Sequence, residues 1–167
     1  PYLVGVLAIL ILPNLEDPEL AIFQVAHTLL PAAVTGIVMA ADSGTPEEAK
    51  AMLEKAVAEL KADKAKALAM FNEGAGGFKD RDLYVYCGGP DGTFTAHINE
   101  KLRGASLKEL KDKDGKAFGE EIYAVATPGE FVEVEYQWNK PDSDALVDKV
   151  AYVTKEGDEI CAVGYYK

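Results

Sequence analysis

The sequence predicts an α+β domain built on a five-stranded antiparallel-type sheet, and three observations support this fold class. Short strands of alternating polarity, separated by turn residues, fill the second half of the chain from Asp82 to Tyr166. One long amphipathic helix precedes them. An apolar segment of membrane type, residues 1–41, lies before that helix. The expected order is therefore an apolar helical segment, a helix, a hairpin, short helices and a three-stranded meander.

Length and charge limit the classes of function. A chain of 167 residues supports one domain plus an appendage, or two very small domains. The net charge of −11 argues against a nucleic-acid partner, because binding phosphates needs a basic face. Residues 1–41 contain no Lys or Arg and only three acids, so the remainder holds all 17 basic residues and 25 of the 28 acids. Two physically different segments therefore meet near Ala41.

The first segment contains two apolar stretches, Tyr2–Leu12 and Leu20–Ala41. The second is long enough to span a hydrocarbon layer of about 30 Å. A secretory signal peptide is the competing interpretation, because Val34–Ala41 ends in small residues, but the basic region that such a peptide needs is absent. We expect residues 1–41 to be a transmembrane segment, a vestigial signal or anchor, or a fusion, and to connect the protein to the membrane.

The front of the chain also carries a resemblance to a transporter family. The motif Leu12-Pro-Asn-Leu-Glu-Asp17-Pro18-Glu19, followed by Thr28-Leu-Leu-Pro31, is similar to one loop and the following helix of the sodium/solute symporters. The resemblance covers about 40 residues. It cannot imply transport by itself, because such transporters need many more spans around a central site. A regulatory domain attached to a symporter remnant is the alternative function.

The long helix begins at Thr45-Pro-Glu-Glu48, where Thr is the N-cap, Pro takes the first helical position and Glu closes a capping box. Apolar residues then recur every three or four positions from Met52 to Phe71 and form one stripe. The glycine-rich stretch Asn72–Gly77 ends the helix after about 27 residues. We expect this helix to pack on the sheet and to carry a signal from it.

Turn residues set the bounds of the strands. Gly88–Gly92 predicts a hairpin turn between the first two strands. A helical turn at Ser106–Leu110 and a helix at Lys116–Ala126, stopped by Thr127-Pro-Gly129, separate these from the meander. The predicted strands are Leu83–Cys87, Thr93–Ile98, Phe131–Trp138, Leu146–Thr154 and Ile160–Tyr166.

The strands place aromatic and basic residues where a small pocket could use them. A pocket for a small anion needs apolar walls, a few donors and one positive charge. Tyr136, Trp138 and Tyr152 supply walls with polar tips, whereas Lys149 and His97 supply charge and donors. The alternatives are core packing for the aromatics, a solvated strand lysine, and a histidine that fixes its own loop. The candidate ligand-binding residues are Tyr84, Tyr86, His97, Tyr136, Trp138, Lys149 and Tyr152.

No motif indicates catalysis, a cofactor or a metal. The chain lacks Gly-x-Ser-x-Gly, His-Glu-x-x-His and a phosphate-binding loop. Cys87 and Cys161 have no zinc-site spacing. They are either a disulfide or two buried thiols, and both states stay open. We expect a non-enzymatic domain without cofactor or metal.

The second half of the chain carries, in this order, the short motifs Tyr84-Val-Tyr86, Asp91-Gly92, Leu102-x-Gly104, Asp114-Gly115-Lys116, Tyr136-x-Trp138, Lys149-x-x-Tyr152 and Val163-Gly164-x-Tyr166. This order resembles the single Cache domain family, whose members are PAS-like extracytoplasmic sensor domains of chemoreceptors and histidine kinases. The resemblance covers about residues 44–167. It departs from the family pattern at His97-Ile98, where His-Pro is usual.

The resemblance implies a PAS-like sheet, a long N-terminal helix and a pocket for a small organic ligand, commonly a short carboxylate. In such a fold the strands of Cys87 and Cys161 would be neighbours, which makes a disulfide geometrically conceivable. The expected function is extracytoplasmic or periplasmic sensing of a small carboxylate, by a protein that is membrane-anchored or exported. The long helix would pass the signal on, within a homodimer or to a separate signalling partner.

Overall fold

The computed structural model describes residues 43–140, 143 and 145–167. The predictions for residues 1–41, namely the membrane or signal segment and the symporter resemblance, lie outside these residues. No helix in the described part of the chain combines the length and apolar character that a membrane span requires.

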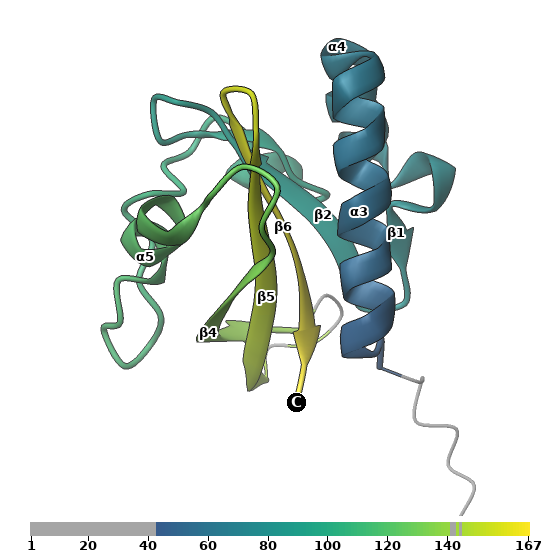
Figure 1. The fold of residues 1–167 in the computed structure, drawn as a ribbon. Helices are drawn as coiled ribbons and strands as arrows, with labels where there is room; N and C mark the ends of the chain where they lie inside the picture. The colour runs from purple at the N-terminus through teal and green to yellow at the C-terminus, as the bar shows by residue number, and fades with distance from the viewer. Residues whose placement is uncertain (1–42, 141–142, 144) are drawn as a thin grey trace, which may run out of the picture. The chain divides into compact units, whose positions relative to one another are not determined.

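The strands form one antiparallel sheet with the order β1-β2-β6-β5-β4, and β3 pairs with β2 beside this path (Figure 1). All five predicted strands are confirmed. The sixth, β1, escaped prediction because two residues are too few to show alternation. The strands are β1 Lys79–Asp80, β2 Leu83–Gly88, β3 Phe94–Ala96, β4 Val132–Asn139, β5 Leu146–Glu156 and β6 Glu159–Tyr166.

Alternation along the strands gives the sheet two different faces. The helix face packs on α3 (Pro46–Ala62) and α4 (Lys64–Glu73), and Val85 and Val163 meet the apolar stripe of these helices there. The opposite face, here called the cavity face, carries Tyr86 and Ala162 and packs on α5 (Phe118–Val125). Figure 1 shows α3 and α5 on the two sides of the sheet.

The prediction of a single long helix is wrong. The helical region is interrupted at Asp63, whose backbone is extended (φ −159°, ψ 100°). The backbone N–H of Asp63 donates to the Glu59 carbonyl at 2.9 Å and closes α3. Its side chain accepts the Lys66 N–H at 3.1 Å and caps α4. An aspartate side chain accepts hydrogen bonds from nearby backbone N–H groups, which disfavours it inside a helix and favours it as an N-cap. The first helix therefore ends at Asp63 and a second one begins after it.

The predicted ends of the helical region are confirmed. Thr45 forms the capping box with Glu48 at the start of α3, and Gly74 caps α4 in the left-handed region (φ 66°). Two short 3₁₀ turns, η1 Ala75–Gly77 and η2 Glu100–Leu102, were not predicted. A helical turn was expected at Ser106–Leu110. The structure has a non-helical turn there, in which the Leu110 N–H donates to the Leu107 carbonyl at 3.1 Å.

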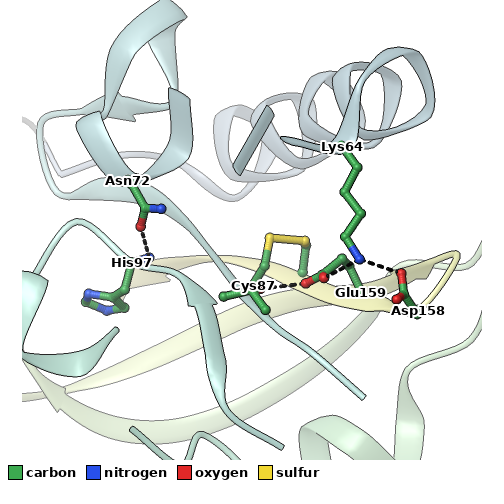
Figure 2. Close-up of a disulfide and its surroundings, with 8 residues drawn as sticks. Lys64, Asn72, Cys87, His97, Asp158 and Glu159 are labelled. Carbon is green, nitrogen blue, oxygen red and sulfur yellow. Dashed lines mark hydrogen bonds and ion pairs between the residues drawn. A yellow bond between two sulfur atoms is a disulfide. The ribbon is translucent and has the colours of Figure 1, made fainter. Parts of the chain in front are cut away.

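A disulfide joins Cys87 of β2 to Cys161 of β6, which lie directly opposite each other in the register of these strands (Figure 2). Beside it, Glu159 is 2% exposed and ties three elements together (Figure 2). Its carboxylate accepts the Thr95 hydroxyl at 2.5 Å and pairs with Lys64 at 2.8 Å. The start of α4 is thereby fixed to β3 and β6.

Removing the disulfide should destabilise the domain strongly, because it closes a chain separation of 74 residues. Loss of this crosslink frees the unfolded chain, and for a loop of this length the cost is about 4 kcal/mol. Urea denaturation of a Cys87→Ala/Cys161→Ala variant checks this, with reduced and alkylated wild type as the control. A loss of less than about 1 kcal/mol would mean that strand pairing alone fixes β2 to β6.

Candidate ligand-binding site

Two adjoining cavities open on the cavity face of the sheet, and Tyr84, His97 and Trp138 line both. The inner one has a volume of about 10 Å³, which is room for a single water molecule. The outer one has a volume of about 670 Å³, within the range of small-molecule sites. A ligand would therefore occupy the outer cavity and touch these three side chains at its floor.

Two of the predicted ligand-binding residues lie beneath this floor. The hydroxyls of Tyr86 and Tyr136 are 3.0 Å apart and hydrogen-bond each other. The Tyr136 ring stacks on Phe118, with 4.1 Å between ring centres. Burial raises the pKa of both tyrosines, so their hydroxyls stay protonated. The structure brings Tyr86 and Tyr136 to the inner cavity, where they fill space.

His97 is fixed in one orientation at the end of β3. Its Nδ1 accepts the Asn99 backbone N–H at 2.9 Å, which leaves the proton on Nε2. Burial, together with the positive charge of Lys149, lowers the pKa of His97 to about 4. The histidine is therefore a neutral donor at physiological pH. The expectation that it supplies positive charge is wrong.

Lys149 is the buried cation of the site. Its side chain is 0% exposed, and its Nζ donates to the Tyr84 hydroxyl at 2.9 Å and to the Tyr166 hydroxyl at 3.3 Å. The ammonium also lies 4.1 Å from the Tyr84 ring centre. Gly164 makes room for the aliphatic stem, since a Cβ there would clash with Cε of Lys149. Among the described residues, no carboxylate pairs with this ammonium.

Lys149 does not line the outer cavity itself, because Tyr84 stands between them. The ammonium occupies a lone pair of the Tyr84 oxygen, so Tyr84 enters the cavity as a donor. The Nε2–H of His97 and the Nε1–H of Trp138 have no hydrogen-bond partner in the described part of the chain. Every fully buried side-chain nitrogen or oxygen there is paired, so both N–H groups are open to solvent. The floor of the cavity thus presents three donors with a cation behind one of them.

Tyr152 does not belong to the site. It lies on β5 three residues from Lys149, and side chains at odd spacing point to opposite faces of a strand. Its ring packs on the helix face, 6.0 Å from the ring centre of Tyr165. A hydrogen bond with Glu133 raises the pKa of Tyr152 to about 12. The structure therefore places Tyr152 apart from the other candidate residues, because alternation along β5 turns its side chain to the helix face.

Sequence reasoning also missed residues that line the outer cavity, among them Lys79, Asn99, Lys111 and Lys113. In a sequence with many charged residues, a loop lysine is expected to be solvent-exposed, so these lysines were not predicted as site residues. The only sequence signal for Lys111 and Lys113 is their spacing around Asp112, beside the turn at Gly115. This pattern does not indicate a binding site by itself, because the contact of the loop with β4 is known only from the structure.

The model of the family Single Cache domain 2 matches residues 29–164, well over half of the chain. The chain belongs to this family. Cache domains are extracytoplasmic sensor modules that bind small ligands such as carboxylic acids, and they are not enzymes. The match begins within the apolar stretch Leu20–Ala41, ahead of the boundary at residue 44 that the resemblance predicted. No curated protein matches the chain.

Three solved structures show the same fold. A methyl-accepting chemotaxis protein from Vibrio parahaemolyticus superposes with a TM-score of 0.60 at 24% identity, covering 72% of this chain and 86% of its own. A Cache chemosensory domain solved for its carboxylic acid recognition gives 0.52 at 23% identity, covering 70% and 84%. A periplasmic sensor domain of a chemotaxis protein gives 0.52 at 21% identity, covering 72% and 88%. The predicted PAS-like architecture is confirmed.

The depressed pKa of His97 should make the domain less stable in mild acid. The unfolded state takes up a proton below about pH 6.5, whereas folded His97 stays neutral down to about pH 4, so stability falls as the pH drops through this window. Urea denaturation at pH 7 and pH 4.5 should show roughly 2 to 3 kcal/mol more loss in wild type than in His97→Gln. Equal losses in both proteins would contradict a neutral buried histidine.

Proposed function

We propose that this domain senses a small organic anion, a short carboxylate, held at the Tyr84, His97 and Trp138 floor of the outer cavity. The observation that carries the proposal is that these three donors converge there in front of Lys149, a buried ammonium without a carboxylate partner among the described residues. Carboxylates accept hydrogen bonds and do not donate them, so they match a floor of donors. The domain acts by binding and not by catalysis.

The energetics favour an anion over a neutral ligand. A buried ammonium is costly unless it is paired, and two tyrosine hydroxyls supply dipoles but no countercharge. A carboxylate on the Tyr84 hydroxyl would lie one hydrogen bond away from Lys149 and would supply that charge. Because Lys149 polarises the Tyr84 hydroxyl, the bond from Tyr84 to the ligand would be strengthened as well.

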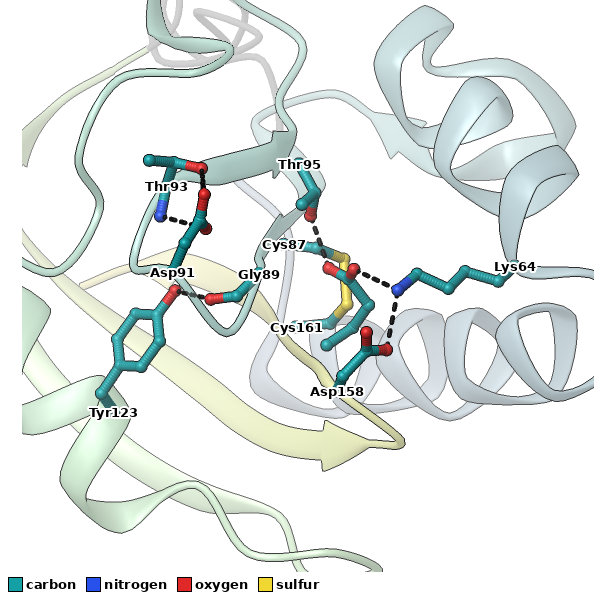
Figure 3. Close-up of polar contacts among 10 residues, drawn as sticks. Lys64, Cys87, Gly89, Asp91, Thr93, Thr95, Tyr123, Asp158 and Cys161 are labelled. Carbon is teal, nitrogen blue, oxygen red and sulfur yellow. Dashed lines mark hydrogen bonds and ion pairs between the residues drawn. A yellow bond between two sulfur atoms is a disulfide. The ribbon is translucent and has the colours of Figure 1, made fainter.

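The signal would leave the site through α4. The backbone N–H of His97 donates to the Asn72 side chain at 3.0 Å (Figure 2), and Arg103 donates to the carbonyls of both Asn72 and His97. At the other end of α4, Lys64 pairs with Glu159 (Figure 2). The same carboxylate accepts the hydroxyl of Thr95 in β3, which lies near Lys64 in Figure 3. Movement of His97 on ligand binding would thus act on α4 and, across Asp63, on α3. A second copy or a separate signalling protein would receive it.

Replacing Lys149 should separate binding from stability. Lys149→Met keeps most of the volume and removes the charge, so carboxylate affinity should fall at least roughly tenfold while the ligand-free domain keeps or gains stability. Calorimetric titration with acetate and propionate measures the affinity, and urea denaturation measures the stability. The matched control is Lys155→Met, the same change farther along β5, which should leave affinity unchanged. Unaltered affinity in Lys149→Met would count against the site.

Asn72 should couple the site to α4. In wild type, propionate should slow hydrogen exchange of the α4 amides as well as those around His97. In Asn72→Ala, protection should remain around His97 and be reduced in α4, because the side-chain acceptor of the His97 N–H is gone while the backbone bond from Arg103 stays. Glu73→Ala, at the neighbouring exposed position, is the control. Protection of α4 that survives in Asn72→Ala would show another route.

A further inference from the structure

The outer cavity carries more positive charge than a single carboxylate needs. Lys79, Lys111 and Lys113 line it, and none of them forms an ion pair with any residue that the structure describes. This is unusual in a chain of net charge −11, in which acids outnumber bases 28 to 17. Nearby Lys116 shows the usual outcome, since it pairs with Glu121 at 2.9 Å.

Asp112 is the one acid among the described residues of the cavity wall, and its carboxylate is already engaged. Oδ1 accepts the backbone N–H groups of Asp114 at 3.1 Å and Lys116 at 2.9 Å. Oδ2 faces the Gln137 N–H at 3.4 Å. These bonds use Asp112 to hold the loop, so the lysines on either side of it keep their charges for the cavity.

The backbone places the three lysines on two sides of the floor. Lys79 of β1 lies directly opposite Tyr84 of β2, so their side chains share a face. The contact of Asp112 with the Gln137 N–H sets Lys111 and Lys113 beside the strand position next to Trp138. An anion bound on the floor would therefore have further cationic groups around the part of the ligand that points outward.

We propose that the outer cavity contains a second anionic subsite at Lys111 and Lys113, beside its floor, and that the ligand is a small dianion. One carboxylate would lie on the Tyr84, His97 and Trp138 floor, and a second anionic group would pair with Lys111 and Lys113. This inference rests on the proposed function, because it takes the floor as the site of the first carboxylate. A volume of about 670 Å³ leaves room beyond acetate or propionate for the longer molecule.

Matched ligands test the second subsite on the 167-residue chain. Titration calorimetry compares propionate and butyrate with malonate, succinate and glutarate, and Trp138, the single tryptophan, reports binding independently by fluorescence. The best dicarboxylate should bind at least roughly tenfold tighter than its monocarboxylate counterpart at low salt, and the advantage should shrink as salt is added. Adding 3-phosphonopropionate distinguishes a second carboxylate from a phosphate-like group.

The decisive variant is Lys111→Gln/Lys113→Gln. It should abolish the advantage of the dianion and leave monocarboxylate affinity within about twofold, because the floor is untouched. Lys66→Gln/Lys101→Gln, which changes the net charge equally on exposed residues outside the cavity, is the control. Monocarboxylates that bind as tightly as dicarboxylates would overturn the second subsite and leave the proposed function standing. Absence of binding by any of these acids would overturn the proposed function itself.

Discussion

The two-residue period of the strands determines which side chains share a face, and the helices, the disulfide and the cavities all depend on it. Neighbouring residues of β2 illustrate this: Cys87 bonds to Cys161 under the helices, whereas Tyr86 points to the other face and bonds to Tyr136. Each central strand is buried on both faces, so shifting its register by one residue would exchange the two cores. The crosslink between directly opposed cysteines fixes the register of β2 against β6, and with it the position of Tyr84 over Lys149.

Lys149 is a buried charge that costs the ligand-free domain stability, which fits the anion site proposed above. Its neighbours on the same face, Tyr136 and Ala151, are buried as well, so an apolar residue would fit its surroundings without the cost of desolvating a charge. Two hydroxyls and two aromatic rings offset part of this cost, at about 1 to 2 kcal/mol each. Gly164 also leaves the lysine space by carrying no side chain. A buried ammonium without a carboxylate partner among the described residues is suited to the anionic ligand proposed above.

The sequence supports the fold better than the site. Strand bounds follow from turn residues such as Gly88–Gly92 and Thr127-Pro-Gly129, and local chemistry is enough to predict them. The helix break at Asp63 was missed because the apolar stripe continues across it, so periodicity outweighed a single capping residue. Residue types alone selected the candidate site residues, and they grouped Tyr152 with Lys149 although the two lie on opposite faces of β5. The burial that neutralises His97 and the loop that carries Lys111 to the cavity are tertiary properties, which no local pattern contains.

The proposed signal transfer would need only small energies. The ties between the site and α4 are a few hydrogen bonds and one ion pair, each stabilising by about 1 kcal/mol, and the coupling of two sites in proteins is typically about 1 to 3 kcal/mol. A ligand of micromolar affinity gains about 8 kcal/mol on binding, which is ample to change two such contacts. The extended backbone of Asp63 separates α4 from α3, so a displacement of α4 would not have to bend α3. The start of α3 and the C-terminus lie at one end of the sheet (Figure 1). At this end the Lys140 ammonium donates to the Ser43 hydroxyl at 3.0 Å. A displacement of α3 would therefore change the structure at the end of the sheet where the described chain begins and ends.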